Sequence, residues 1–385
     1  MRALYKIVHT SSRICWEDPE KRIYDESVWM ESQGHQVVII APKDSPLFLK
    51  ARDHGISVYP MSFKGLGRIN EYRELIQILE NEQPYVVNSH GRADAKMALK
   101  AAQKTGVACR IISRHSGGKL RNTWQNRNLF KKMSHYVFTS SRHTTEIVKQ
   151  TFKLKEMEVF SIPGSIVPPA ELIPRPEARK SMAAGLGLAP DARFIGIIGP
   201  SDHSGISAVI KAFKKIRTDI PHHLVITGNE DCRPGFENCA NEAECTGRLH
   251  FIPSMDDPWT YYRALDCGIM TADRVNGSPL GAVPRALEEA MFGSCPVIAG
   301  YAGGTEDIVI PDKTGLLYKT EAQLPDMVLN TLAKEAATRE RVHHARELVK
   351  KHHTIDTMGR DIIRIYRLHQ VKLEKQFLPG SLRQT

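Results

Sequence analysis

Long hydrophobic runs are missing from this sequence of 385 residues. No apolar stretch approaches the roughly 18–20 residues that a membrane-spanning helix needs. The first residues, M-R-A-L-Y-K, also lack the apolar core and the small-residue cleavage site of a secretory signal. We therefore expect a soluble, cytoplasmic protein, with peripheral attachment to the inner membrane face left open.

The sequence also lacks the closely paired cysteines of a zinc site. Its seven cysteines are scattered, and the most clustered three, Cys232, Cys239 and Cys245, are separated by six and five residues. Zinc ligands usually come in pairs with about two to four residues between them. We expect reduced thiols and no bound metal.

Acidic residues are absent from one long stretch. Between Asp94 and Glu146 there is no carboxylate, but there are eleven lysines and arginines. Residues 1–165 hold 26 of the 53 basic residues and only 16 of the 43 acidic ones, so the whole net charge of +10 lies there. Such a basic face favours an anionic lipid surface, nucleic acid or a phosphorylated substrate, although it can also be a solvated helix face without a specific partner.

What the sequence does contain is a regular alternation of short apolar runs with helical patterns, which is typical of βαβ units and parallel sheets. In the first half the predicted strands cover residues 3–9, 36–41, 56–60, 85–89, 108–113, 135–139 and 158–162. In the second half they cover residues 193–199, 223–228, 248–252, 266–272 and 295–299.

Five prolines between Pro163 and Pro176 interrupt this alternation, because proline continues neither a helix nor a central strand. We therefore predict two tandem doubly wound (Rossmann-like) α/β domains, at 1–165 and 177–355, joined by a linker at 166–176. Residues 356–385 are expected to form a helix that packs back on the first domain, followed by a frayed tail. Ligands of such folds bind at the carboxyl ends of the strands, so we expect an interdomain cleft.

The segment from Gly281 to Val309 carries the most signals. It reads G-A-V-P-R-A-L-E-E-A-M-F-G, then S-C-P-V-I-A, and after three more residues G-G-T-E-D-I-V. Pro284 suits the first turn of a helix that ends at Gly293. A Gly-Gly turn with Thr305 as N-cap would open a second helix, whose free N–H groups and positive dipole end suit a phosphate.

Taken together, this segment resembles the donor domain of the family 4 glycosyltransferases, retaining enzymes of the GT-B fold. That family carries E-G-x-P-R-A-L-x-E-A-M, then G-x-P-V-I-A and G-G-x-x-E-I-V, and residues 284–309 follow this order before T-G-L-L at 314–317. In the first half, G-H-Q-V-V at 34–38, V-N-S-H at 87–90 and S-R-H at 113–115 agree more loosely. The likeness is nearest to bacterial surface-polysaccharide enzymes.

The resemblance implies a role for individual residues. Glu289 would bind the ribose hydroxyls of a nucleotide-sugar donor, while the adjacent Glu288 is expected to be solvated. His115, beside the transferred sugar, and Arg114 are the predicted catalytic residues. The other predicted donor-binding residues are Ser201, Ser204, Gly281, Pro284, Gly303, Gly304 and Thr305. The predicted acceptor-binding residues are Asn88, His90 and Arg92.

Three features depart from the family pattern. Gly281 stands where the family's first glutamate touches the donor sugar. The loop 199–205, G-P-S-D-H-S-G, lacks the arginine and lysine that hold the diphosphate, and loss of one such group typically reduces the rate ~10²–10³-fold. The stretch S-S-R-I-C-W-E-D-P at 11–19 replaces a Gly-Gly loop. We expect three features to compensate for the missing arginine and lysine at the diphosphate: serine hydroxyls, the N-terminus of a helix that opens at Gly205, and Arg114.

We therefore expect a glycosyltransferase that moves a sugar with retention from a UDP- or GDP-linked donor to a glycan or lipid-linked acceptor, as in surface polysaccharide synthesis. No Asp-x-Asp triplet occurs, which is the metal anchor of the other main glycosyltransferase fold, so we expect no metal and no cofactor. The alternative is a catalytically impaired relative that only binds sugar or nucleotide. Nucleotide-sugar epimerisation also stays open. Nucleic acid is not an expected partner, because the basic stretch has few aromatics and no recognition motif.

Overall fold

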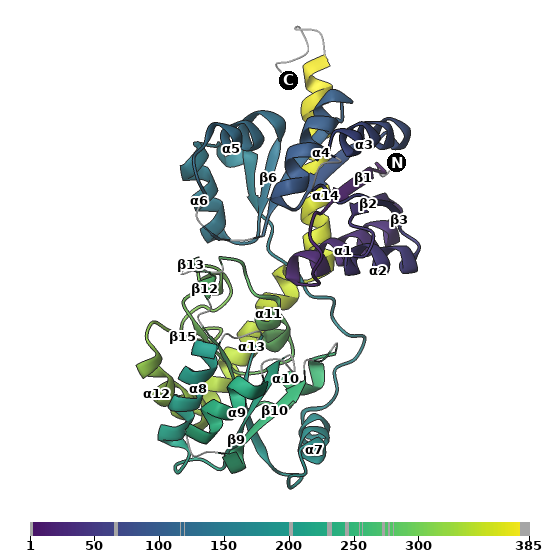
Figure 1. Ribbon diagram of the computed structural model, residues 1–385. Coiled ribbons are helices and arrows are strands. Elements are labelled where there is room, and N and C mark those ends of the chain that lie inside the picture. Colours follow the sequence, from purple (N-terminus) through teal and green to yellow (C-terminus); the bar gives the residue numbers. More distant parts are fainter. Residues whose placement is uncertain are drawn as a thin grey trace. The chain divides into compact units, whose positions relative to one another are not determined.

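The structure is a computed structural model that describes residues 3–64, 68–115, 117–118, 120–199, 203–228, 233–242, 246–253, 255, 257–271, 274–275, 278–279 and 281–377. The chain divides into two compact units: unit 1 comprises residues 1–165 and 355–385, and unit 2 comprises residues 166–354. Each unit is built on a parallel sheet covered by helices. The predicted pair of doubly wound α/β folds is confirmed (Figure 1).

The sheet of unit 1 has the strand order β3-β2-β1-β4-β5-β6-β7, and every neighbouring pair is parallel. Its strands are buried on both faces, which explains their nearly continuous apolar runs. Ile7 packs toward α1 and α14, and the next residue, Val8, packs toward α3 and α4. The strands are β1 (Lys6–Thr10), β2 (Gln36–Ala41), β3 (Ser57–Pro60), β4 (Val86–Ser89), β5 (Cys109–Arg114), β6 (Tyr136–Thr139) and β7 (Val159–Ser161).

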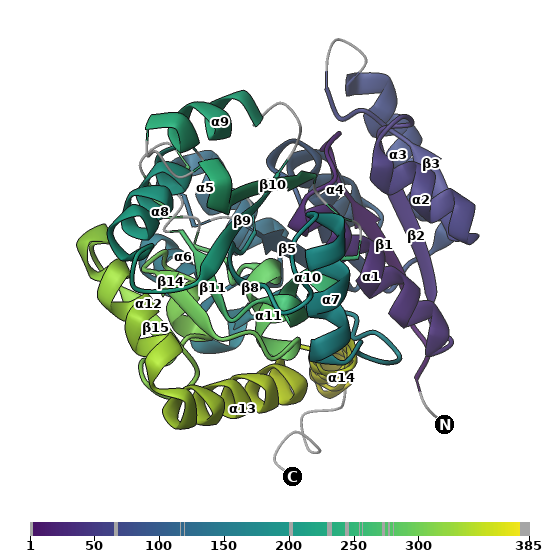
Figure 2. The ribbon, with the colours of Figure 1, turned by 90° about the horizontal axis from the view of Figure 1, so that it is seen from below.

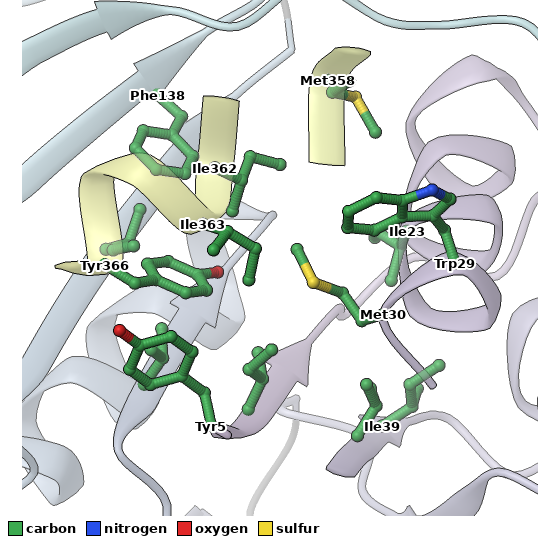
Figure 3. Close-up of a cluster of buried hydrophobic side chains, with 14 of the residues drawn as sticks. Tyr5, Ile23, Trp29, Met30, Ile39, Phe138, Met358, Ile362, Ile363 and Tyr366 are labelled. Atoms are coloured by element: carbon green, nitrogen blue, oxygen red, sulfur yellow. The ribbon is translucent and has the colours of Figure 1, made fainter. Parts of the chain in front are cut away.

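Helices cover both faces of this sheet. They are α1 (Asp18–Ser32), α2 (Pro46–His54), α3 (Arg68–Glu82), α4 (Arg92–Lys104), α5 (Trp124–Asn128), α6 (Arg142–Phe152) and α14 (Ile355–Phe377). The last of these comes from the far end of the chain and packs against α1 (Figure 1). Figure 3 shows its side chains Met358, Ile362, Ile363 and Tyr366 within the core of unit 1.

A close fit between α1 and α14 holds the C-terminal helix against unit 1. The indole N–H of Trp29 donates to Asp356 at 2.7 Å. Gly359 lies against the indole ring so closely that an added Cβ would be 2.6 Å from its Cδ2 atom. Burial of the apolar face of α14 therefore completes the core of unit 1.

Unit 2 has the strand order β10-β9-β8-β11-β14-β15, again all parallel. The strands are β8 (Arg193–Ile197), β9 (His222–Gly228), β10 (Leu249–Pro253), β11 (Cys267–Met270), β14 (Val297–Gly300) and β15 (Leu316–Tyr318), with a short hairpin of β12 (Arg274–Val275) and β13 (Ser278–Pro279). One face carries α8 (His203–Ile216), α9 (Arg233–Glu242) and α12 (Leu324–Ala333). The other carries α7 (Arg175–Gly185), α10 (Trp259–Ala264), α11 (Arg285–Phe292) and α13 (Glu335–His352) (Figure 2).

The structure differs from the sequence predictions at a few elements. All twelve predicted strands are present, with ends that differ by up to three residues, but β12, β13 and β15 were not predicted. The start of the predicted linker is part of unit 2, because Ile166 is fully buried and its N–H donates to the His353 carbonyl at 2.9 Å. Helix α7 already begins at Arg175. The predicted frayed tail beyond residue 377 lies outside the described residues.

Candidate functional site

The carboxyl edge of the sheet in unit 2 brings several predicted donor-binding residues together. The N–H of Gly281 donates to the Ala302 carbonyl at 3.0 Å, immediately before the Gly303-Gly304 turn. A Cβ added at Gly304 would overlap the carbonyl group of Ala282 and lie 2.7 Å from the Val283 nitrogen. The segment before α11 and the turn after β14 are therefore packed backbone to backbone, which only glycine permits at this position.

The prediction that Thr305 caps a second helix is wrong. The turn is followed by a single 3₁₀ turn, Thr305–Asp307, whose N-cap position is Gly304. The Thr305 hydroxyl donates to the Gly300 carbonyl at 2.8 Å and accepts from the Ala302 N–H at 3.1 Å. Thr305 therefore closes the turn on itself, and one short turn lacks the aligned peptide dipoles of an α-helix.

Helix α11 presents its two adjacent glutamates differently from the prediction. Glu288, which was expected in solvent, is fully buried and its Oε1 lies 2.7 Å from Nδ1 of His353. Glu289 is partly exposed and accepts from Nε of Arg285 at 2.9 Å. Pro284 occupies the N-cap position, one residue before the predicted first turn. The carboxylate at the accessible face of the helix is therefore Glu289, already partnered by a cation that the prediction omitted.

The loop after β8 reaches the same edge. Gly199 has φ of 72°, and an added Cβ would lie 3.1 Å from Ala286 of α11 and 3.2 Å from Met270 at the end of β11. Ser204 is exposed in the first turn of α8. Ser201, another predicted donor-binding residue, lies outside the described residues. The start of α8 is thus one α-helical N-terminus at this edge that can meet an anion.

The carboxyl edge of unit 1 is organised by a buried carboxylate. Asp94, in the first turn of α4, accepts from the N–H groups of His90 and Gly91, both at 3.1 Å. The hydroxyls of Thr10 and Ser12 donate to it at 3.0 and 2.9 Å. Asp94 therefore joins the loop after β1 to the loop after β4, where His90 lies.

Three histidines form a continuous line at this edge. Nδ1 of His9 is 2.9 Å from Nε2 of His90, and Nδ1 of His90 is 2.9 Å from Nε2 of His115. His9 and His90 are buried and His115 is partly exposed. At the inner end, Nε2 of His9 is 3.7 Å from Oε1 of Glu26, and Glu26 is fully buried on α1.

Burial decides the protonation of this line. It lowers the pKa of His9 to about 3, with Arg22 adding repulsion. It also holds the pKa values of His90 and His115 well below the usual histidine range. Burial raises the pKa of Glu26 to about 7, against the opposing attraction of Arg22. At neutral pH the three imidazoles are therefore neutral, and Glu26 is near its midpoint of ionisation.

The other predicted residues of unit 1 occupy different environments. Arg114 is half-buried and donates to the Gly118 carbonyl, and burial lowers its pKa to about 10. Asn88 is fully buried and accepts from the Ser113 hydroxyl at 2.9 Å, so it supports the edge rather than facing an acceptor. Arg92 is exposed at the start of α4. His90 and His115 are the two predicted site residues that touch each other here.

Most of the basic stretch without carboxylates lies on the surface. Arg110 and Arg114 donate to backbone carbonyls of unit 1 and are structural cations. Trp124, at the start of α5, is 77% exposed within the same stretch. The exposed cations are Lys96, Lys100, Lys104, Arg121, Arg127, Lys131, Lys132 and Arg142. None of the helices in the described ranges combines the length and apolar composition needed to cross a membrane.

One group of side chains could offer ligands to a metal ion. The thiol of Cys15 and the carboxylates of Glu17 and Glu20 have ligand atoms within 4.8 Å of one another. Arg13 pairs with both carboxylates, at 2.8 Å from Nε to Glu20. The guanidinium already supplies the positive charge at this position, so we assign no metal to the group.

Sequence reasoning missed His9, Glu26, Asp94 and Arg285. Asp94 had a signal, because a carboxylate three positions after an N-cap residue can accept from the N-cap N–H, as the Gly91 N–H shows. Arg285 had one as well, since it lies four residues before Glu289 on the same helix face. His9 and Glu26 are far apart in the sequence and carried no local signal.

Two sequence profiles of known protein families match this chain, one in each half. The sequence profile described as glycosyl transferases group 1 matches residues 180–349, and that of glycosyltransferase family 4 matches residues 19–167. No curated protein sequence gave a significant match.

Solved structures share the fold at low sequence identity. A glycosyltransferase from Rickettsia africae superposes with a TM-score of 0.84 at 16% identity, covering 95% of this chain and 99% of that one. HepE of Anabaena in complex with UDP-glucose superposes with a TM-score of 0.75 at 14% identity, covering 94% of this chain and 98% of that one. The lipopolysaccharide outer core galactosyltransferase WaaB superposes with a TM-score of 0.69 at 14% identity, again covering 94% of this chain and 98% of that one. The two sequence profiles, which match residues 19–167 and 180–349, show that the chain belongs to the family 4 glycosyltransferases, and the solved structures share its two doubly wound units of the GT-B fold.

Proposed function

We propose that the protein transfers a sugar from a UDP- or GDP-linked donor to a glycan or lipid-linked acceptor, with retention at the anomeric carbon. The observation that carries this proposal is the edge of unit 2 at which Gly199, Gly281 and the Gly303-Gly304 turn lie close to the start of α11, the helix that carries Glu289. A carboxylate that accepts two vicinal hydroxyls suits a ribose. The unit 2 edge is therefore the proposed donor site.

The diphosphate would be held without a local arginine or lysine in the loop after β8. The N-terminus of α8, with the exposed hydroxyl of Ser204, offers hydrogen-bond donors and the positive end of a helix dipole. We propose no metal and no cofactor. In family 4 chemistry no protein nucleophile is required, and the leaving phosphate helps to deprotonate the acceptor on the same face.

The acceptor is assigned to the edge of unit 1, at His90 and His115, with Arg92 at its exposed side. The exposed cations of the basic stretch and the exposed indole of Trp124 favour attachment to an anionic membrane surface. This supports a lipid-linked acceptor in surface polysaccharide synthesis, at the inner face of the membrane. Among the solved structures that share the fold, HepE is in complex with UDP-glucose, and WaaB is a lipopolysaccharide outer core galactosyltransferase.

The test is release of nucleotide from a panel of UDP- and GDP-sugars with purified protein and candidate acceptors. Glu289→Gln should weaken nucleotide binding about tenfold or more, since hydrogen bonds to a charged group contribute about 1.5–3 kcal/mol. Glu335→Gln is the matched control, because Glu335 is an exposed carboxylate paired with Arg339 on α13. Absence of nucleotide release with every donor and acceptor would contradict the proposal.

The second candidate is a relative that binds a nucleotide sugar without turning it over. It is favoured by the glycine at position 281, in place of the family's first glutamate, and by the loop at 199–205 without arginine or lysine. Titration calorimetry with UDP, GDP and their sugars separates the two candidates. Donor binding without acceptor-dependent product would favour the binder.

A further inference from the structure

A row of neutral histidines can be hydrogen-bonded in only two ways. Each neutral imidazole carries one N–H and one bare nitrogen. Because His90 contacts His9 through Nε2 and His115 through Nδ1, it donates to one neighbour and must accept from the other. All the hydrogen bonds in the line therefore point the same way, either inward toward His9 or outward toward His115.

The two directions differ at the ends of the line. In the inward direction, Nε2 of His9 carries a proton that faces a Glu26 carboxylate, and Nδ1 of His115 is a bare lone pair. In the outward direction, Nε2 of His9 is bare and faces a protonated Glu26, and Nδ1 of His115 carries a proton. The 3.7 Å between Nε2 of His9 and Oε1 of Glu26 is an ion-pair distance rather than a hydrogen bond. Within the described part of the chain, neither of these atoms nor Oε2 of Glu26 has a hydrogen-bond partner.

We propose that Glu26 is a positioning residue that sets, through His9 and His90, whether Nδ1 of His115 accepts or donates a proton. One proton on Glu26 corresponds to one proton on Nδ1 of His115, and the intervening imidazoles stay neutral. Glu26 itself is fully enclosed by the core of unit 1 and touches no substrate.

The groups that face this line favour a change of direction near neutral pH. On the elements packed against α1, they are Arg22 on α1 itself, Tyr366 on α14 and Arg13 in the loop after β1. Arg22 lies 3.9 Å from Oε2 of Glu26 and lowers its pKa, but burial outweighs this and leaves the pKa at about 7. Above that pH the inward direction prevails, and below it the outward one.

In the reaction, the direction of this line would decide whether Nδ1 of His115 accepts a hydrogen bond from a bound ligand or donates one to it; this use rests on the proposed transferase function. As the acceptor oxygen bonds to the anomeric carbon, the bond from that carbon to the diphosphate breaks and its electron pair leaves with the diphosphate. The acceptor proton passes to the leaving phosphate, and the line of histidines transfers no proton in that step.

The linkage is measured by ¹⁵N NMR of histidine-labelled full-length protein between about pH 5.5 and 8.5. The two ring nitrogens report which one carries the proton, and loss of a signal in His115→Gln assigns it. For wild-type protein we expect the proton of His115 to move from Nε2 to Nδ1 as the pH falls through about 7, without formation of a doubly protonated ring.

Two variants separate the linkage from a structural effect. In Glu26→Gln the tautomer of His115 should be independent of pH, and in His9→Asn, which keeps a polar group beside His90, the dependence should also be lost. Glu82→Gln is the control, because Glu82 pairs with Lys6 in the same unit and has a lowered pKa. A pH-independent tautomer in wild type, or an unchanged transition in Glu26→Gln, would overturn the proposal.

Activity provides a second readout. For wild-type enzyme kcat/KM should change with pH around 7, because the hydrogen bond between Nδ1 of His115 and the ligand reverses there, and this change should be missing from Glu26→Gln. The same change at the same pH in the variant would overturn the proposal. The NMR experiment uses no nucleotide sugar, so absence of turnover would count against the transferase proposal alone.

Discussion

Substitution of Gly304 by alanine is the sharpest test of how the proposed donor site in unit 2 is built. Gly304 has φ of −117°, which any residue can adopt, so backbone strain is not the reason for glycine here. The reason is space: the new Cβ would overlap the Ala282 carbonyl group and lie 2.7 Å from the Val283 nitrogen. Those atoms belong to the backbone just before α11 and cannot rotate away as a side chain could.

The cost follows from the shift that this overlap requires. Overpacking in a close-packed interior typically costs about 1–3 kcal/mol, and a clash with backbone falls at the upper end of that range. A loss of about 3 kcal/mol lowers the melting temperature of a domain of this size by roughly 6–12 °C. Because the displaced segment leads from Gly281 to Glu289, nucleotide affinity should fall as well.

Thermal unfolding and titration with UDP and GDP measure both effects. Gly185→Ala is the matched control in unit 2, because no atom lies within 4 Å of its added Cβ and its φ is not in the left-handed region. It should be neutral or slightly stabilising. A Gly304→Ala protein that melts within about 2 °C of wild type and binds nucleotide normally would refute the assignment of this edge.

Three further predictions concern unit 1. Asp94→Asn, which places an amide among four donors, should lower the free energy of unfolding by about 3 kcal/mol in urea titrations; a loss below about 1 kcal/mol would contradict the capping role. Gly359→Ala should separate α14 from Trp29 and increase tryptophan solvent exposure, seen as a fluorescence red shift; unchanged emission would argue against this packing. Glu26→Gln should be more stable than wild type by up to about 3 kcal/mol at pH 8, because the charged form of the Glu26 carboxyl is disfavoured in the folded state, as its raised pKa indicates. The difference in stability should vanish below about pH 4.5, and equal stability at pH 8 would contradict the raised pKa.

The sequence predicts the sheets well because their strands are buried on both faces. Ile7 and Val8 both have to be apolar, since each faces a separate helical layer, and such runs are visible without any tertiary knowledge. Strand β15 has only three residues and leaves too short a signal. Thr305 follows a Gly-Gly turn as an N-cap would, but the chain makes a single 3₁₀ turn before Ile308 enters the core.

The site was predicted less completely, because its contacts are made between distant segments. Glu288 and Glu289 are adjacent on one helix, and which of them is buried depends on His353, which lies more than sixty residues later. His9 and Glu26 likewise become a buried pair only when α1 packs near β1 in the folded unit. Family resemblance indicated His115, but it could not indicate the residues behind it.

The buried line from Glu26 to His115 is hard to explain as a device for stability. Its neighbours Ile7, Ile23 and Met30 are fully buried apolar residues, so apolar side chains in place of His9 and Glu26 would fit the same core. Above pH 7 the Glu26 carboxylate alone costs about 3 kcal/mol of folding free energy, and a buried charge that is incompletely paired is seldom favourable. Asp94 differs, because its four hydrogen bonds fix two loops. Polar groups that destabilise a core and end at the proposed acceptor-binding edge are better explained by control of His115 than by the fold.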